Sequence, residues 1–387
     1  MTDPGLALIL SGGGARAAYQ VGFLRYLSGR HPDLAPGILT GVSAGGLIAA
    51  LLASRPGDFA EAVDRLTQTW QHLRIEDVFR VDPKDLAARV SRWGFRLVSG
   101  GRPGSERVRS LVDTAPLGTL LDRVLAPQAD GTFPGIADNL AARRLDAVAL
   151  TASSYTTGQS VTWVQSRSGL DLLTLDGARR TAVSGRLRLD HVMASASLPF
   201  FFPAVAVDGA WYGDGGIRLT APLSPAIQLG ARRIIAVGTR YARSPEEARR
   251  PSVDGYPPPT QVAGVLFNAI FLDLLDSDAR RLEQINALID HLPPDQHSDL
   301  RRIELLVLRP SQDLGRLANE FEAALPRAFR FLFRGLGSRQ TRSNDMLSLL
   351  MFQSDYIQRL IELGEADARA RAGDIDAFLS GTRLEAP

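Results

Sequence analysis

The sequence predicts an α/β fold with a mainly parallel central sheet covered by helices. Short apolar segments at residues 6–10 and 38–42 are typical of buried strands, and each precedes a stretch of helical character, at residues 16–27 and 44–53. The order strand, helix, strand, helix favours parallel strands joined by crossover helices. Strands recur as far as residues 303–308 with no linker between separate halves, which indicates one α/β domain.

The composition is that of an ordinary globular protein. The 387 residues are 45% hydrophobic and 22% charged, which is enough apolar material for a large core. The net charge of +2 carries no signature of nucleic-acid binding, so we expect no nucleic-acid partner. The absence of cysteine excludes disulfides, thiolate metal sites and cysteine nucleophiles, and the five histidines lack metal-ligand spacing.

The remaining elements follow from periodicity and turn residues. Residues 59–125 are mostly helical in pattern, with breaks at Pro83, residues 100–104 and Pro116. Beyond them we expect strands at residues 145–151, 160–165, 233–237 and 303–308, a hairpin of residues 204–207 with 211–212 around Asp208-Gly209, and helices at residues 189–196, 222–229 and 262–292.

The C-terminal part is helical in pattern. Residues 243–261 are rich in proline and charge and predict a long polar loop, whereas the chain from Leu314 onward has helical character almost to its end. We therefore predict an α/β domain over residues 5–310 and a helical C-terminal extension over residues 311–387 that packs on it.

Ser43 lies in a pattern that is typical of a catalytic serine. The segment Gly41-Val-Ser-Ala-Gly45 follows a predicted strand and precedes a predicted helix, which is the context of a nucleophile elbow. A serine on such a sharp turn projects its hydroxyl from the end of the strand, and the flanking glycines avoid a clash of Cβ atoms in the corner. The alternative is a glycine-rich helix start without catalytic meaning.

Gly12, Gly13 and Gly14 form a second motif between the first strand and the first helix. Such a loop lets backbone N–H groups approach an anion, and the helix dipole adds positive potential. The glycine and lysine spacing of nucleotide-binding loops is absent. Because neighbouring parallel strands bring this loop and the serine to one edge of the sheet, an oxyanion hole is the favoured interpretation, with a plain tight turn as the alternative.

Asp214 is the candidate general base. It lies in Gly213-Asp-Gly-Gly216 after a predicted strand, where an ordinary turn is the alternative. A serine triad would need a histidine oriented by a carboxylate. His291 and His297 flank a polar loop that we expect on the surface, and His191 lies on a short helix. A direct dyad of Ser43 and Asp214 is therefore favoured.

Three motifs in this order resemble the patatin-like phospholipase family. They are Gly12-Gly-Gly-Ala-Arg16, Gly41-Val-Ser-Ala-Gly45 and Asp214-Gly-Gly216. Residues 194–203 and 230–237 resemble the segments before and after the aspartate in bacterial members, so the resemblance covers roughly residues 5–240. Ala17 departs from the glycine that the family usually has there, and we expect the loop to be kept with an earlier helix start.

The resemblance implies a three-layer α/β/α fold and hydrolysis of acyl esters of lipids, phospholipids in particular. It implies that Ser43 is acylated, that Asp214 moves the proton and that the glycine loop of Gly12, Gly13 and Gly14 holds the oxyanion. Arg16, Gly41, Gly45, Gly215 and Gly216 support these motifs, and no metal or other cofactor is implied. The residues leave three alternatives open: an acyltransferase, a thioesterase, or a non-catalytic scaffold of the same fold.

Residues 326–336 predict an amphipathic helix with two interpretations. Arg327, Arg330 and Arg334 share one face, and Phe329, Phe333 and neighbouring leucines share the other. Such a helix can lie on an anionic membrane, or it can pack its phenylalanines on the core. Residues 92–96 carry a smaller run of the same kind. No signal sequence or membrane span is recognised, so we expect a soluble, cytoplasmic protein, with peripheral membrane contact under the first interpretation.

Overall fold

The computed structural model describes residues 3–80, 110–167, 177–293 and 300–381, together with residues 82, 88–89, 91–92 and 95. The predicted breaks at Pro83 and at residues 100–104 lie outside the described residues, as do His297 and most of the run at residues 92–96.

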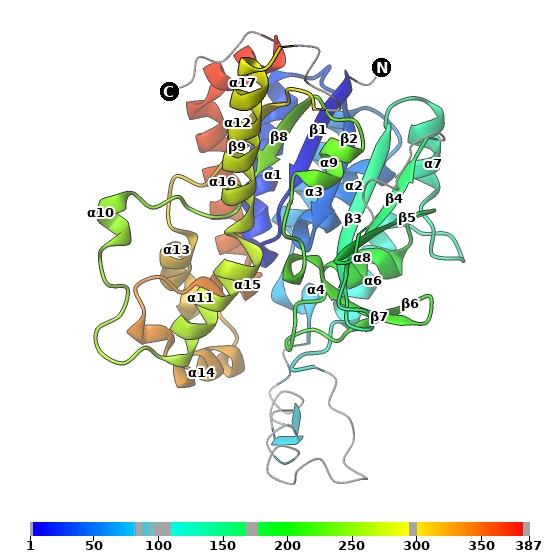
Figure 1. Ribbon diagram of the computed structural model, residues 1–387. Helices are drawn as coiled ribbons and strands as arrows, with labels where there is room; N and C mark the ends of the chain where they lie inside the picture. Colours follow the sequence, from blue (N-terminus) through cyan, green and yellow to red (C-terminus); the bar gives the residue numbers. More distant parts are fainter. Residues whose placement is uncertain are drawn as a thin grey trace.

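A central sheet organises the described part of the chain (Figure 1). Seven strands follow the order β5-β4-β3-β2-β1-β8-β9, and β7 joins them by pairing with β3 and with β6. The strands are β1 (Asp3–Leu10), β2 (Pro36–Val42), β3 (Ala147–Ser154), β4 (Ser160–Ser166), β5 (Arg180–Ser184), β6 (Val205–Val207), β7 (Ala210–Asp214), β8 (Arg233–Val237) and β9 (Glu304–Leu308).

The predicted α/β class with a mainly parallel sheet is confirmed. Strands β1, β2, β3, β8 and β9 all run parallel, whereas β4 is antiparallel to β3 because a short turn joins them. The predicted hairpin is present as β6 and β7, and Asp208 and Gly209 at its tip both have positive φ, as a tight hairpin turn requires. Strand β5 was not predicted, because this edge strand is largely exposed and lacks an apolar pattern.

Helices cover both faces of the sheet, which makes the three layers implied by the resemblance. Along β1 the side chains of Leu6, Leu8 and Leu10 enter one core, and those of Ala7 and Ile9 enter the other. The larger core is covered by α1, α2, α3, α6 and the C-terminal helices, and the smaller one by α9 and α12.

The helices include several departures from the sequence prediction. Residues 262–292 form two helices rather than one, with a break at Leu272–Asp273, and the predicted loop of residues 243–261 contains a short helix whose cap is Ser244. The described α-helices include α1 (Ala18–Arg30), α2 (Ala44–Ser54), α3 (Phe59–Gln71), α4 (Ile75–Val78), α6 (Ala115–Leu125), α7 (Pro134–Ala141), α8 (Leu189–Ser195), α9 (Ser224–Gln228), α10 (Pro245–Ala248), α11 (Pro259–Phe271), α12 (Leu274–His291), α13 (Leu314–Phe321), α14 (Arg327–Gly335), α15 (Asp345–Leu350), α16 (Ser354–Ala370) and α17 (Ala372–Leu379). Within the described residues, no helix is both long and apolar enough to cross a membrane.

The C-terminal helices share the larger core with the α/β part. Helix α16 packs along α1, and two glycines permit the close approach (Figure 1). A Cβ atom at Gly22 of α1 would collide with the backbone carbonyl of Ile361, and one at Gly364 of α16 would collide with that of Tyr19. Contact of backbone with backbone leaves no flexible side chain that could move aside.

This packing predicts a difference between two glycines of α1. Gly22→Ala should destabilise the protein by at least about 1–3 kcal/mol, because the added methyl group forces the helices apart. Gly29→Ala is the matched control, since nothing lies within 4 Å of its Cβ position, and it should be neutral or stabilise by about 0.5–1 kcal/mol. Chemical denaturation of both variants measures the difference. Equal stabilities would contradict the close crossing.

Candidate active site

Ser43 occupies a strained turn between β2 and α2. Its φ of 56° and ψ of −131° are unfavourable for a residue with a Cβ atom, and its side chain is largely buried. Helix α2 begins at the next residue, so the hydroxyl lies at the carboxyl end of the strand, beside the start of the helix. This is the geometry that a nucleophile elbow needs.

Three neighbours hold the elbow in this shape. A Cβ atom at Gly41 would collide with the carbonyl of Gly45, and one at Gly45 would collide with the carbonyl of Leu10. The backbone N–H of Ser43 donates to Ser195 Oγ at 3.1 Å, and Ser195 Oγ donates to the Thr151 carbonyl at 2.7 Å. The strained turn is therefore supported by close backbone packing and by a buried hydroxyl from α8.

The strand register brings Asp214 next to Ser43. Val42, the last residue of β2, pairs with Thr151 of β3, and the next residue of β3, Ala152, pairs with Asp214 at the end of β7. A Cβ atom at Gly215 would contact both the Thr151 carbonyl and the Val42 side chain. Residues 171 positions apart in the chain thus meet at one edge of the sheet because β7 turns back along β3.

The Asp214 carboxyl group is fully buried. Its Oδ1 accepts the N–H of Gly216 at 2.9 Å, whereas Oδ2 accepts no hydrogen bond of standard geometry from any described residue. Burial raises the pKa of Asp214 to about 7, although the Ser43 hydroxyl and the Gly216 N–H partly oppose the rise. A carboxyl group with a pKa near 7 is partly ionised at neutral pH, and its carboxylate form can accept a proton.

The glycine loop lies against Ser43. A Cβ atom at Gly12 would come within 3.1 Å of Ser43 Cβ, and φ is 151° at Gly13 and 54° at Gly14, values that favour glycine. Thr239 Oγ1 donates to the Gly12 carbonyl at 2.7 Å. Since carbonyl and N–H point in opposite directions across a trans peptide, this bond turns the N–H of Gly13 away from Thr239.

An apolar pocket opens at this group of residues. It holds about 870 Å³ of space, part of it open to solvent, and Gly13, Gly14 and Ser43 lie on its wall. Apolar residues of α2, α3 and α6 form about half of the remainder, among them Leu47 and Trp70. Residues from far along the chain complete the wall: Phe271, Leu349, Leu350 and Phe352. The apolar lining of this pocket suits a long apolar group.

None of the described histidines lines this pocket. His191 is buried against the Trp163 ring, its Nδ1 accepts the backbone N–H of Arg188 at 3.0 Å, and burial lowers its pKa to about 4. His291 is exposed at the end of α12. Within the described ranges no cluster of three His, Asp or Glu side chains is placed to hold a metal ion.

The remaining motif residues have structural contacts. Gly216 packs against the Phe271 ring, where a Cβ atom would not fit. Arg16 is buried and forms an ion pair with Asp345 of α15 at 2.6 Å. Sequence reasoning missed Ser195, Thr239 and the contribution of α15; only Ser195 lies in a segment that carried the family resemblance.

A comparison with protein-family profiles matches residues 8–227 to the family described as patatin-like phospholipase. The chain belongs to the patatin-like phospholipase family. A search of curated proteins finds no significant match.

Solved structures give distant matches that each cover 98% of this chain. Human GIVD cytosolic phospholipase A2 in complex with methyl gamma-linolenyl fluorophosphonate and terbium chloride is 14% identical, with a TM-score of 0.44. VipD from Legionella pneumophila is 13% identical, with 79% of its chain covered and a TM-score of 0.31, and the type III effector protein ExoU is 15% identical, with 80% covered and a TM-score of 0.24. The chain spans 59% of the length of the phospholipase A2 chain.

The raised pKa predicts how Asp214→Asn changes stability with pH. Between about pH 4 and pH 7 the folded protein keeps a proton that the unfolded chain releases, so the stability of the wild type falls as pH rises through this window. Asp214→Asn removes this penalty, so its advantage should be near zero at pH 4 and reach at most on the order of 4 kcal/mol at pH 8.

Denaturation at both pH values measures the effect. Asp208→Asn, a change at the exposed tip of the same hairpin, is the matched control and should alter stability by no more than about 0.5 kcal/mol. An advantage of Asp214→Asn that does not grow with pH would contradict a carboxyl group that is costly to ionise.

Proposed function

We propose that this protein is a serine acyl hydrolase that cleaves acyl esters of lipids, phospholipids in particular, with a dyad of Ser43 and Asp214. The observation that carries the proposal is the buried Asp214 carboxyl group beside a strained serine at the wall of an apolar pocket. Membership of the patatin-like phospholipase family supports the same reaction class.

Each half of the reaction uses the same two side chains. Ser43 Oγ attacks the acyl carbonyl carbon while Asp214 Oδ2 accepts the serine proton. The ester bond then breaks, the alkoxide leaves with the proton from Asp214, and the acyl group stays on Ser43. Water attacks the acyl-enzyme and passes its proton to Asp214, and the fatty acid leaves as Ser43 recovers a proton.

The glycine loop is the proposed oxyanion hole. The negative charge develops on the acyl oxygen next to Ser43, and the amides of Gly13 and Gly14 are available because no described group accepts their hydrogen bonds. The orientation of the Gly12 peptide by Thr239 supports this role for Gly13. Gly12 itself packs beneath Ser43, so we assign it a spacing role.

The alternatives differ in what happens to the acyl-enzyme. An acyltransferase would pass the acyl group to another alcohol instead of water, and a thioesterase would receive it from a thioester. Either would keep the same dyad, so product analysis with ester and thioester substrates separates them. A non-catalytic scaffold has no need of a buried carboxyl group beside a strained serine.

The dyad predicts distinct effects for its two members. Ser43→Ala should abolish both ester hydrolysis and covalent labelling by a fluorophosphonate, whereas Asp214→Asn should lower kcat at least about 100-fold because the base is lost. His291→Gln is the control and should keep turnover. A folded Ser43→Ala variant that is still labelled would refute the nucleophile, and a loss as complete for His191→Gln as for Asp214→Asn would favour a triad.

We further propose that an apolar surface formed by Phe331, Val265 and Leu266 docks the enzyme on an anionic membrane. The structure changes the basis of this hypothesis, since Phe329 and Phe333 of α14 pack in the core. Phe331 is instead 82% exposed and lies one helical turn from the exposed Arg327. Arg334 pairs with Glu322 at 2.9 Å, so it is partly neutralised.

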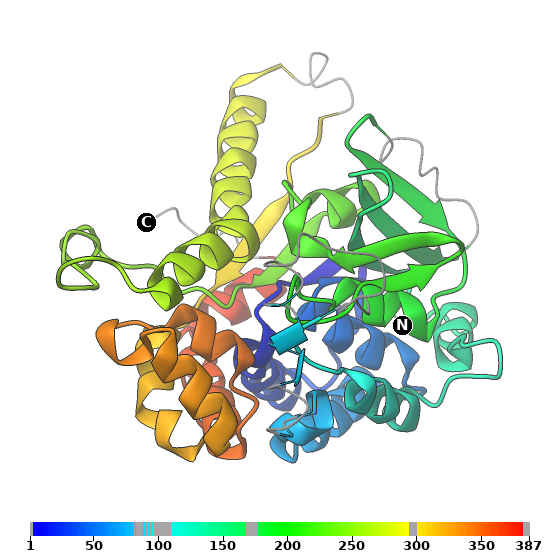
Figure 2. The same ribbon diagram turned by 90° about the horizontal axis from the view of Figure 1, so that it is seen from below.

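Helix α11 extends this surface. Val265 and Leu266 are each 57% exposed, and the N-terminus of α11 contacts the end of α14 through the bond from Thr260 N–H to the Leu336 carbonyl. Figure 2 shows α11, in yellow-green, beside the orange helices, to which α14 belongs. Because Phe271 at the end of α11 lines the pocket, a bilayer held by this surface would lie near the proposed site.

The docking proposal predicts that Leu266→Asp with Phe331→Asp weakens sedimentation with phosphatidylglycerol vesicles at least about tenfold, because two apolar side chains no longer enter the interface. Turnover of a short soluble ester should stay unchanged. Leu288→Asp, at an exposed position on α12, which carries none of this surface, is the matched control and should bind as the wild type does. Equal binding by the double variant would refute the docking surface.

A further inference from the structure

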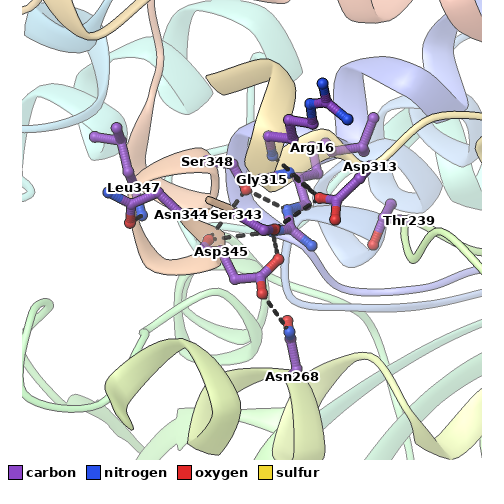
Figure 3. Close-up of polar contacts among 12 residues, drawn as sticks. Arg16, Thr239, Asn268, Asp313, Gly315, Ser343, Asn344, Asp345, Leu347 and Ser348 are labelled. Carbon is purple, nitrogen blue, oxygen red and sulfur yellow. Dashed lines mark hydrogen bonds and ion pairs between the residues drawn. The ribbon is translucent and has the colours of Figure 1, made fainter. Parts of the chain in front are cut away.

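A buried ion pair joins α15, a helix of the C-terminal part, to Arg16, which follows the glycine loop. Arg16 is 2% exposed, and its guanidinium contacts Asp345 Oδ1 at 2.6 Å, the Asp345 carbonyl at 3.2 Å and the Ser348 hydroxyl (Figure 3). A buried guanidinium is costly unless it is paired and hydrogen-bonded. The position of Arg16 therefore depends on α15.

Arg16 is part of the turn that shapes the proposed oxyanion hole. Its backbone N–H donates to the Gly13 carbonyl at 3.0 Å, which closes the first turn after the loop. At the other end of α15, the Leu349 carbonyl lies against Gly14, where a Cβ atom would collide with it. The loop is thus held at Gly12 by the hydrogen bond from Thr239 and at Gly14 by the contact with α15.

Asp345 is itself fixed by a second element of the site. Its Oδ2 accepts from Asn268 Nδ2 of α11 at 2.7 Å (Figure 3). Three residues farther along α11, Phe271 packs on Gly216, whose N–H binds the Asp214 carboxylate. One carboxylate therefore connects the glycine loop with the helix that supports the loop of the proposed base.

We infer that Asp345 is a positioning residue that sets the glycine loop through Arg16, so that the C-terminal extension completes the oxyanion hole. This inference rests on the proposed function, because an oxyanion hole has meaning only for acyl transfer. This role affects rate rather than binding. A misplaced amide stabilises the transition state less, whereas the pocket that binds the acyl chain is kept.

The test uses Asp345→Asn in the full chain. With a short soluble ester, kcat should fall about tenfold with little change in KM, and labelling of Ser43 by a fluorophosphonate should slow in parallel; removal of a donor outright costs about 100-fold or more. The pH at which kcat is half-maximal should stay where it is, because Asp214 is untouched. Ser348→Ala removes one contact of Arg16 and is the milder variant if Asp345→Asn folds poorly.

Glu365→Gln is the matched control. It breaks the ion pair between Glu365 of α16 and Arg25 of α1. Like the pair of Arg16 and Asp345, this pair joins the α/β part to the C-terminal helices, but it does not involve the glycine loop. Glu365→Gln should lower Tm without changing kcat. Equal kcat in wild type, Asp345→Asn and Ser348→Ala, or equal losses in Asp345→Asn and Glu365→Gln, would overturn the inference. A wild type without hydrolysis or labelling would instead refute the proposed function.

Discussion

Burial of the Asp214 carboxyl group is the constraint on which the rest of the site depends. Ionising a carboxyl group in the protein interior is costly, and the pKa of about 7 expresses that cost. Among the described residues, the Ser43 hydroxyl and the Gly216 N–H oppose this cost, and they do not offset it fully. Had further donors been present, the pKa would be low and the group would be a weak base.

The same constraint requires very close packing of backbone. Glycines stand wherever two turns meet: Gly45 against the end of β1, Gly215 against the end of β3 and Gly14 against α15. Each contact leaves no room for a Cβ atom. The close packing that brings the loops together therefore also contributes to the burial that raises the pKa of Asp214.

The site is not confined to the segment that matches the family. That match ends at residue 227, yet Phe271 and Phe352 line the pocket and Asp345 pairs with Arg16. Helix α16 fastens this C-terminal part to α1 through the glycine-mediated crossing. The segment up to residue 227 thus carries the proposed dyad, while the remainder forms part of the pocket wall and contacts the glycine loop.

Much of the fold could be predicted from local sequence. Buried strands and their following helices have strong apolar signals, so β1, β2 and the helices after them were placed within a few residues, and the Asp208-Gly209 turn marked a hairpin. The exposed edge strand β5 gave no such signal, and the break between α11 and α12 lacks a glycine or proline.

The sequence by itself also singled out Ser43, Asp214 and the glycine loop, because tight turns around a serine or an amide restrict which residues fit. Only the tertiary structure decided that β7 folds back along β3 to reach Ser43, that Phe329 and Phe333 face the core, and that Asp345 meets Arg16. The physical reason is the distance along the chain between the residues that interact. Turns and helices follow from neighbouring residues, whereas a buried ion pair between residues 329 positions apart depends on how whole helices pack.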